Sequence, residues 1–178
     1  MKYLKNRRSP RHKEFDYSQP GAYLGTICTK DRVCLFGEIR DDSMILNAAG
    51  RMVHRWLLKA PSKFPVLETD EYIIMPNHLH CVLFNIPNDK SLRMDQEIEA
   101  NPSLSDIVQW FKTMTTNEYI RGVRDLQWIP FRRQLWLRSF YDHVIRNEEE
   151  LAAYRTYILQ NPLKWVLDLD NPENFPGD

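Results

Sequence analysis

The sequence lacks any long apolar run, and no stretch approaches the roughly 18 apolar residues that a membrane helix needs. The charged start, Met1–Arg8, is not followed by an apolar stretch, so it is not typical of a secretory signal. Only three cysteines are present in 178 residues, with none at CxxC spacing. This scarcity argues against a disulfide framework and against a thiolate zinc site. We therefore expect a cytoplasmic protein with no membrane partner.

Net charge is also lacking, since 24 Lys and Arg balance 24 Asp and Glu. The balance by itself gives no support to nucleic-acid binding, but the charges are unevenly placed. Residues 1–19 are rich in Lys and Arg and residues 166–178 in acidic side chains. Either both are solvated tails, or the first is a basic arm that touches a polyanion. No repeat, low-complexity segment or linker divides the chain, whose length suits one domain with a sizeable core.

The hydrophobic periodicities predict an ordered series of strands and helices. We expect a strand over 21–28 paired with one over 33–39 across a hairpin loop at 30–32, followed by a helix from a cap at Ser43 to Pro61. Two further strands, over 64–75 and 78–86, should be joined by a turn at Pro76-Asn77. A helix should then start at Ser103, and a last helix should be capped by Asn147 and closed by Pro162. This order predicts an α+β fold in which helices pack on an antiparallel sheet.

Two histidines stand two residues apart in the segment Pro76-Asn77-His78-Leu79-His80-Cys81. In a strand, residues at this spacing point to one face, so His78 and His80 project together while Leu79 points into the core. Two neutral imidazoles make half of a divalent-metal site and leave positions open for a further ligand, water or phosphate. The alternative is that both are surface residues of a half-exposed strand.

The last helix carries two tyrosines at different angles. Tyr154 shares an apolar stripe with Leu151 and Ile158, which favours packing. Tyr157 lies at the border of that stripe, and Asn161 follows four residues later on the same face. An amide that ligates a metal beside a phenol would suit a metal-assisted nucleophile. The alternative is a tyrosine at the core edge with a helix-capping asparagine.

Arginines and aromatics are interleaved over residues 121–146, where no clean period is present. Arginine suits phosphates, and exposed aromatics stack on unpaired bases. The alternative is a core of aromatics, Trp136 and Phe140 among them, beneath an ordinary solvated surface of arginines.

Together these segments resemble the single-tyrosine His-hydrophobic-His transposases, and most closely the REP-associated tyrosine transposases. The resemblance is carried by Pro76–Cys81, by the run Leu135–Arg146, by Tyr157–Pro162, and by the helix Ser105–Thr115 with Phe111-Lys112. It runs in order from Gly21 to Trp165 and therefore covers the expected domain, residues 20–165. It does not extend to the basic arm 1–19 or the acidic tail 166–178.

The resemblance implies a ferredoxin-like antiparallel sheet and a single-strand DNA endonuclease and strand transferase. A magnesium or manganese ion would be held by His78, His80 and Asn161, and Tyr157 would form a 5′-phosphotyrosine. Single-stranded or hairpin DNA would be the partner, and both a homodimer and a monomer are open. The DNA-binding residues we expect are Lys112, Arg132, Arg133, Arg138, His143 and Arg146; for His143 and Arg146, phosphate contact and structural bracing are both open. The alternatives are a catalytically silent or host-retained DNA-hairpin-binding module, and a metal-dependent hydrolase that activates water.

Overall fold

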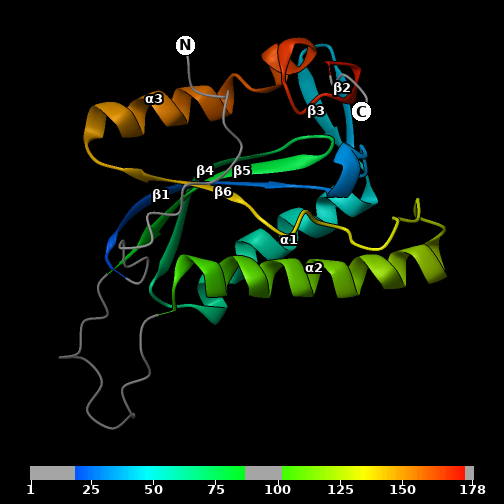
Figure 1. Cartoon of the computed structure of the whole chain (residues 1–178), viewed down its shortest axis with the longest axis horizontal. Helices are drawn as coiled ribbons and strands as arrows, with labels where there is room; N and C mark the ends of the chain where they lie inside the picture. Colours follow the sequence, from blue (N-terminus) through cyan, green and yellow to red (C-terminus); the bar gives the residue numbers. More distant parts are fainter. Residues whose placement is uncertain (1–18, 87–101, 175–178) are drawn as a thin grey trace, which may run out of the picture.

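A four-stranded antiparallel sheet of order β4-β5-β1-β6 forms the central layer of the structure, a computed structural model that describes residues 19–86 and 102–174 (Figure 1). The strands are β1 (Gly21–Cys28), β4 (Leu67–Ile74), β5 (His78–Asn85) and β6 (Tyr141–Ile145). Helix α1 (Ala48–Lys63) lies between β1 and β4 in the chain, and α2 (Leu104–Leu126) between β5 and β6. The predicted ferredoxin-like α+β fold is confirmed.

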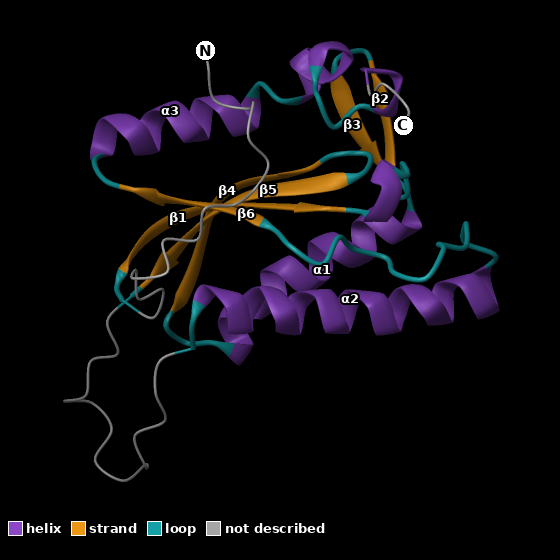
Figure 2. Cartoon of the chain, viewed as in Figure 1, coloured by secondary structure: helices purple, strands orange, loops and turns teal. Residues whose placement is uncertain are grey.

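The two faces of the sheet have different covers. Helices α1 and α2 lie on one face, and α3 (Glu148–Leu159) lies on the other (Figure 2). Alternation along β5 directs Leu79, Cys81 and Leu83 to the larger core beneath α1 and α2. The side chain of Val82 joins the smaller apolar cluster under α3. Because residues two apart share a face, His78 and His80 lie on the α3 side of the sheet.

The predicted pairing of residues 21–28 with 33–39 is wrong. β1 pairs with β5 and β6, whereas β2 (Gly37–Arg40) pairs with β3 (Ser43–Leu46) in a separate two-stranded sheet. Asp41 and Asp42 between them both have positive φ, at 49° and 56°, which matches the tight turn whose twist suits a two-residue hairpin. The expected loop at 30–32 is the short 3₁₀ helix η1 (Lys30–Arg32).

The start of α1 also differs from the expectation. Ser43 belongs to β3, and the helix begins after Asn47, whose side chain accepts a hydrogen bond from the Gly50 backbone N–H. Pro61 lies within the last turn of α1 and not at its end. Asparagine is as good a cap as serine, so the predicted helix is present but both its start and its end were misplaced.

The other helix starts are confirmed. Ser103 and Asp106 form a capping box at the start of α2, and the Asn147 side chain accepts from the Glu150 N–H at the start of α3. After α3, η3 (Pro162–Leu167) and η4 (Pro172–Asn174) bring the chain back over the end of the sheet. No helix in residues 19–86 and 102–174 is both long and apolar enough to cross a membrane.

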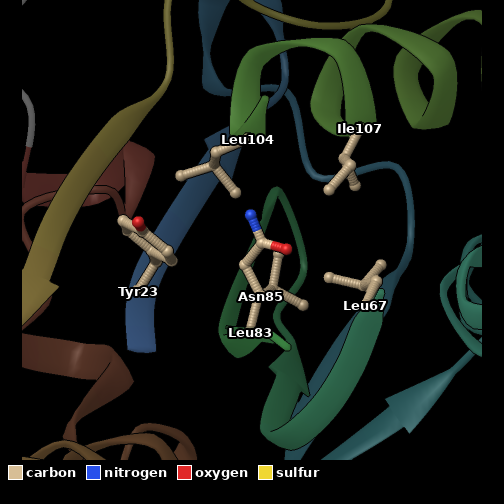
Figure 3. Close-up of a pocket in the computed structure, with 6 residues that line it drawn as sticks. All are labelled: Tyr23, Leu67, Leu83, Asn85, Leu104 and Ile107. Carbon is tan, nitrogen blue, oxygen red and sulfur yellow. The ribbon is translucent and has the colours of Figure 1, made fainter. Parts of the chain in front are cut away.

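A small cavity lies on the α2 side of the sheet (Figure 3). Its volume is about 10 Å³, which is enough for about one water molecule. The residues that line it are mostly apolar: Tyr23, Leu67, Leu83, Asn85, Leu104 and Ile107. It is therefore a packing feature and not a place for a nucleotide.

Candidate active site

His78 and His80 are buried side by side on the α3 face of β5. Their side chains are 0% and 5% exposed, and the ring centroids are 4.5 Å apart. The two imidazoles therefore converge, as their spacing predicts. Burying two polar rings in an otherwise apolar strand costs free energy unless partners satisfy them, so the neighbours of the rings are informative.

Each ring is oriented through its Nδ1 atom. His78 Nδ1 lies 2.9 Å from Asn77 Oδ1, and His80 Nδ1 lies 2.8 Å from Thr26 Oγ1. The Asn77 Nδ2 atom donates to the carbonyls of Arg32 and Asp170. The amide atom that faces His78 is therefore the oxygen, which can only accept. His78 therefore donates through Nδ1, and its Nε2 is the nitrogen that carries the lone pair, with Asp168 Oδ2 3.9 Å away. A partner on one ring nitrogen that fixes the tautomer for the other is the usual arrangement at metal-binding histidines.

The hydroxyl of Tyr157 lies 3.3 Å from Nε2 of His80, and the ring centroids are 5.2 Å apart. Tyr157 is half-buried on α3, and this contact brings its hydroxyl to the histidine pair. Tyr154, whose helical spacing predicts a packing residue, is half-buried. It packs on the smaller apolar cluster, and its ring lies 5.4 Å from that of His143.

Burial sets the protonation of this group of side chains. It holds the pKa of His80 well below its ordinary value, and the neighbouring His78 lowers it further against the opposing effect of Asp168 and Asp170. His80 is therefore neutral near pH 7, as a metal ligand must be. Burial and Asp168 raise the pKa of Tyr157 to about 12, opposed by a hydrogen bond from Asn161.

Asn161 lies just after α3, the helix that carries Tyr157 and that we call the tyrosine helix, and its side chain is buried. It keeps right-handed helical geometry (φ −60°, ψ −42°) although Pro162 follows, and its backbone N–H donates to the Ile158 carbonyl. The side chain is 2% exposed, and its Oδ1 atom accepts no hydrogen bond within residues 19–86 and 102–174. A buried amide oxygen without a donor is expensive, and a cation would satisfy it.

Asp168, which no sequence pattern singled out, lies beside the histidine pair. Its Oδ2 atom lies 3.9 Å from His78 Nε2, and one ligand atom each from His78, His80 and Asp168 all lie within 4.8 Å of one another. The adjacent Asp170 is buried and pairs with Arg32 at 2.9 Å. Residues 168–174, assigned to an acidic tail, thus lie against the histidines. No local spacing signals this, because Asp168 and His78 are distant in sequence.

Two polar contacts fix the tyrosine helix to the sheet. At its start, Glu150 lies 2.7 Å from His143 Nε2 and accepts the Arg146 backbone N–H. Along its length, Arg155 makes two hydrogen bonds to Asp70, which lies at an irregularity of β4. Of the two roles left open for His143, bracing is the one for which the structure provides a contact.

The remaining candidate DNA-binding residues differ in their surroundings. Lys112 Nζ donates to the carbonyls of residues 137–139, so its ammonium holds a loop. The exposed side chains are Arg132, Arg133, Arg138 and Arg146. Trp136 and Phe140 are buried, as anticipated. The backbone of residues 135–137 pairs with that of 28–30, and residue 28 is opposite His78 in the sheet. Arg138 therefore follows a segment at the His78 end of β1.

Comparison with known proteins gives both sequence and fold relatives. The chain is 34% identical over 174 residues to a Haemophilus influenzae protein described as an “Uncharacterized protein”, covering 93% of each chain. It is 24% identical over 154 residues to a “Putative REP-associated tyrosine transposase” of the same organism, covering 84% of this chain and 74% of that protein. No family model matches the chain.

A solved structure has the same fold at lower identity. It is that of a REP-associated tyrosine transposase bound to a REP hairpin, with a TM-score of 0.55 at 18% identity over 84% of this chain and 69% of that chain. At this identity the likeness concerns the fold. The sequence and fold relatives together confirm the resemblance to the REP-associated tyrosine transposases, and the chain belongs to the same family as the uncharacterised Haemophilus protein.

Proposed function

We propose that this protein is a metal-dependent single-strand DNA endonuclease and strand transferase that uses Tyr157 as its nucleophile. The observation that carries the proposal is the 3.3 Å approach of the Tyr157 hydroxyl to His80 Nε2, beside a second buried imidazole. A transposase-type, DNA-binding role is supported by the relatives. The fold alone would not assign the chemistry, so the proposal depends on these side chains.

The residues present fit a divalent ion. Two imidazole nitrogens, the buried amide oxygen of Asn161 and the carboxylate of Asp168 provide nitrogen and oxygen donors, a set that suits magnesium or manganese. His78, His80 and Asn161 would hold the ion. When bound, it would polarise the scissile phosphate and neutralise the charge that develops there.

The chemical step follows from the position of the phenol. Tyr157 Oη attacks the phosphorus of a phosphodiester and gives its proton to solvent, while the bond from phosphorus to the 3′ oxygen breaks and that oxygen takes a proton from solvent. The products are a 5′-phosphotyrosine and a free 3′-hydroxyl. The phosphodiester energy is kept in the covalent link, so the 3′-hydroxyl of a second strand can reverse the step and join DNA. Burial raises the pKa of Tyr157 and Asn161 lowers it less, so loss of the phenolic proton is a barrier to attack.

Exposed arginines provide a path for DNA at the rim of the site. Arg138 follows the segment paired beside Cys28, and Arg132 and Arg133 precede it in the same irregular stretch. With Arg146 at the start of α3 they would contact phosphates. Lys112 and His143 would act through the loop and the helix that they brace.

Single-stranded or hairpin DNA is expected to bind more tightly than plain duplex. Binding should weaken as salt rises, because each phosphate contact releases condensed counterions at a log–log slope of about −0.7 per contact on a single strand. Fluorescence anisotropy over a salt series measures both. Arg138→Ala should make this slope shallower by about one contact. Equal affinity for duplex and single strand would contradict the expectation.

The direct test is a covalent adduct. The protein is incubated with Mn²⁺ and a pool of single-stranded DNA hairpins, and the mixture is run on a denaturing gel. The label is placed in the part of the strand 3′ to the cleavage site, which keeps the 5′-phosphate and stays on the protein. We expect a labelled protein band that protease removes and EDTA prevents. DNA binding with neither an adduct nor cleavage would favour the hairpin-binding module. Cleavage without an adduct would favour the hydrolase.

A further inference from the structure

We propose that Asp168 provides a carboxylate ligand to the divalent ion, so that the segment after the tyrosine helix completes the metal site. The inference rests on the proposed function insofar as it places an ion at the histidine pair. It goes further by assigning a ligand at Asp168, which lies beyond the motifs that carry the family resemblance. It also predicts which metals the site prefers.

The first argument is position. The Asp168 carboxylate and the two imidazoles form a group of three in which the ligand atoms lie within 4.8 Å of one another. Metal–ligand bonds of about 2.0–2.2 Å place two ligand atoms about 3–4 Å apart around one ion. The 3.9 Å between His78 Nε2 and Asp168 Oδ2 lies in this range. The three groups need no large movement to share an ion.

The second argument is that the segment is held in place. Asp168 Oδ1 accepts the Asp170 backbone N–H at 2.7 Å, which orients the carboxylate. Asp170 in turn pairs with Arg32 and accepts, through its carbonyl, the Asn77 side chain at 2.7 Å. The same Asn77 accepts from His78 Nδ1. One side chain thus orients a histidine and anchors the segment that carries Asp168, which is the pattern of a supported metal ligand.

The third argument is charge. Two neutral imidazoles bring no negative charge to a buried dication, and uncompensated charge in such a place is costly. One carboxylate reduces this cost. It also changes selectivity, because imidazole nitrogens alone favour metals such as nickel and zinc, whereas carboxylate oxygen favours magnesium and manganese. Asp168 should therefore matter more for Mn²⁺ than for Ni²⁺.

The test is direct metal binding to the full chain without DNA. Free Mn²⁺ is followed by electron paramagnetic resonance, and Ni²⁺ by calorimetry. Asp168→Asn should weaken Mn²⁺ binding by about 10–100-fold or more, which is the loss found even for outer partners of metal ligands, and should weaken Ni²⁺ binding less. The matched control is Glu173→Gln, which removes the same charge from an exposed position in the same segment. It should bind both metals as the wild type does.

If Asp168→Asn does not fold, Asp168→Glu replaces it as the test variant because it keeps the carboxylate. Asp168→Glu should retain Mn²⁺ binding better than Asp168→Ala. Unchanged Mn²⁺ affinity in Asp168→Asn, or an equal loss for both metals, would overturn the inference. The outcomes are separable from the proposed function: Mn²⁺ binding that depends on Asp168 with no DNA adduct removes the DNA chemistry alone, and an adduct with Mn²⁺ affinity independent of Asp168 removes the ligand assignment alone.

Discussion

Replacing Tyr157 by phenylalanine is expected to abolish the covalent protein–DNA adduct. The substitution removes only the hydroxyl that lies 3.3 Å from His80 Nε2, and the ring keeps its place on the smaller apolar cluster. Loss of one such hydrogen bond changes the free energy of unfolding by about 1 kcal/mol. The adduct on a denaturing gel should fall below detection, while hairpin binding measured by anisotropy should stay near the wild-type value.

Tyr154→Phe is the matched control, since it removes a hydroxyl from the same helix, three residues away. It should keep the adduct. An adduct that persists in Tyr157→Phe and disappears in Tyr154→Phe would transfer the nucleophile to Tyr154. DNA cleavage by Tyr157→Phe without any covalent link would identify water as the nucleophile and favour the hydrolase.

Replacing both His78 and His80 by alanine is expected to remove Mn²⁺ binding and all metal-dependent cleavage. In the wild type, a ligand at 100 times its dissociation constant adds about 2.7 kcal/mol to the free energy of unfolding, so Mn²⁺ should raise the melting temperature. The double variant should show no such rise. Without metal it should also be less stable, because Asn77 Oδ1 and Thr26 Oγ1 lose their buried partners, at about 1–3 kcal/mol per unsatisfied group.

His54→Ala controls for general loss of a histidine. His54 bonds to Tyr72 at 2.8 Å, and Tyr72 packs with the core under α1 and α2, across the sheet from the pair. This variant should keep the rise in melting temperature with Mn²⁺ and the DNA adduct. A double variant at His78 and His80 whose melting temperature still rises with Mn²⁺ would place the ion elsewhere.

The substitutions at the metal ligands and at the nucleophile affect different steps, so together they test the whole assignment of the site. Tyr157→Phe should bind Mn²⁺ and DNA yet form no adduct. The double histidine variant should lack Mn²⁺ binding and the adduct together. Asp168→Asn should weaken Mn²⁺ binding more than Ni²⁺ binding. Only a site in which the three groups of residues act as assigned gives this pattern.

Local geometry explains what the sequence by itself determined. The two-residue period of a strand put His78 and His80 on one face, and the 100° step of a helix separated Tyr157 from Tyr154. Side-chain caps at Ser103 and Asn147 depend on contacts with the next turn, so both helix starts were predicted correctly. Each of these features is decided by residues within four positions of one another.

Tertiary structure alone decided the strand pairing of the N-terminal half. Residues 33–39 have the composition of a strand partner for β1, and their hydrophobic pattern does not say which partner is chosen. The turn at Asp41-Asp42 joins β2 to β3, and β1 is left to β5 and β6. That choice sets Thr26 opposite His80 and Cys28 opposite His78, and so supplies the Thr26 hydroxyl that orients the His80 ring.

Tertiary structure also decided the final composition of the site. From the sequence, Asp168 and Asp170 are two acids in a polar tail, and a run of acids is typical of solvated surface. The fold returns this segment to the sheet through Arg32 and Asn77, two residues far from it in the chain. Periodicity reports only which face a side chain takes on its own element. Which distant segment then meets that face depends on the packing of the whole chain, and here it brings a carboxylate to the histidine pair.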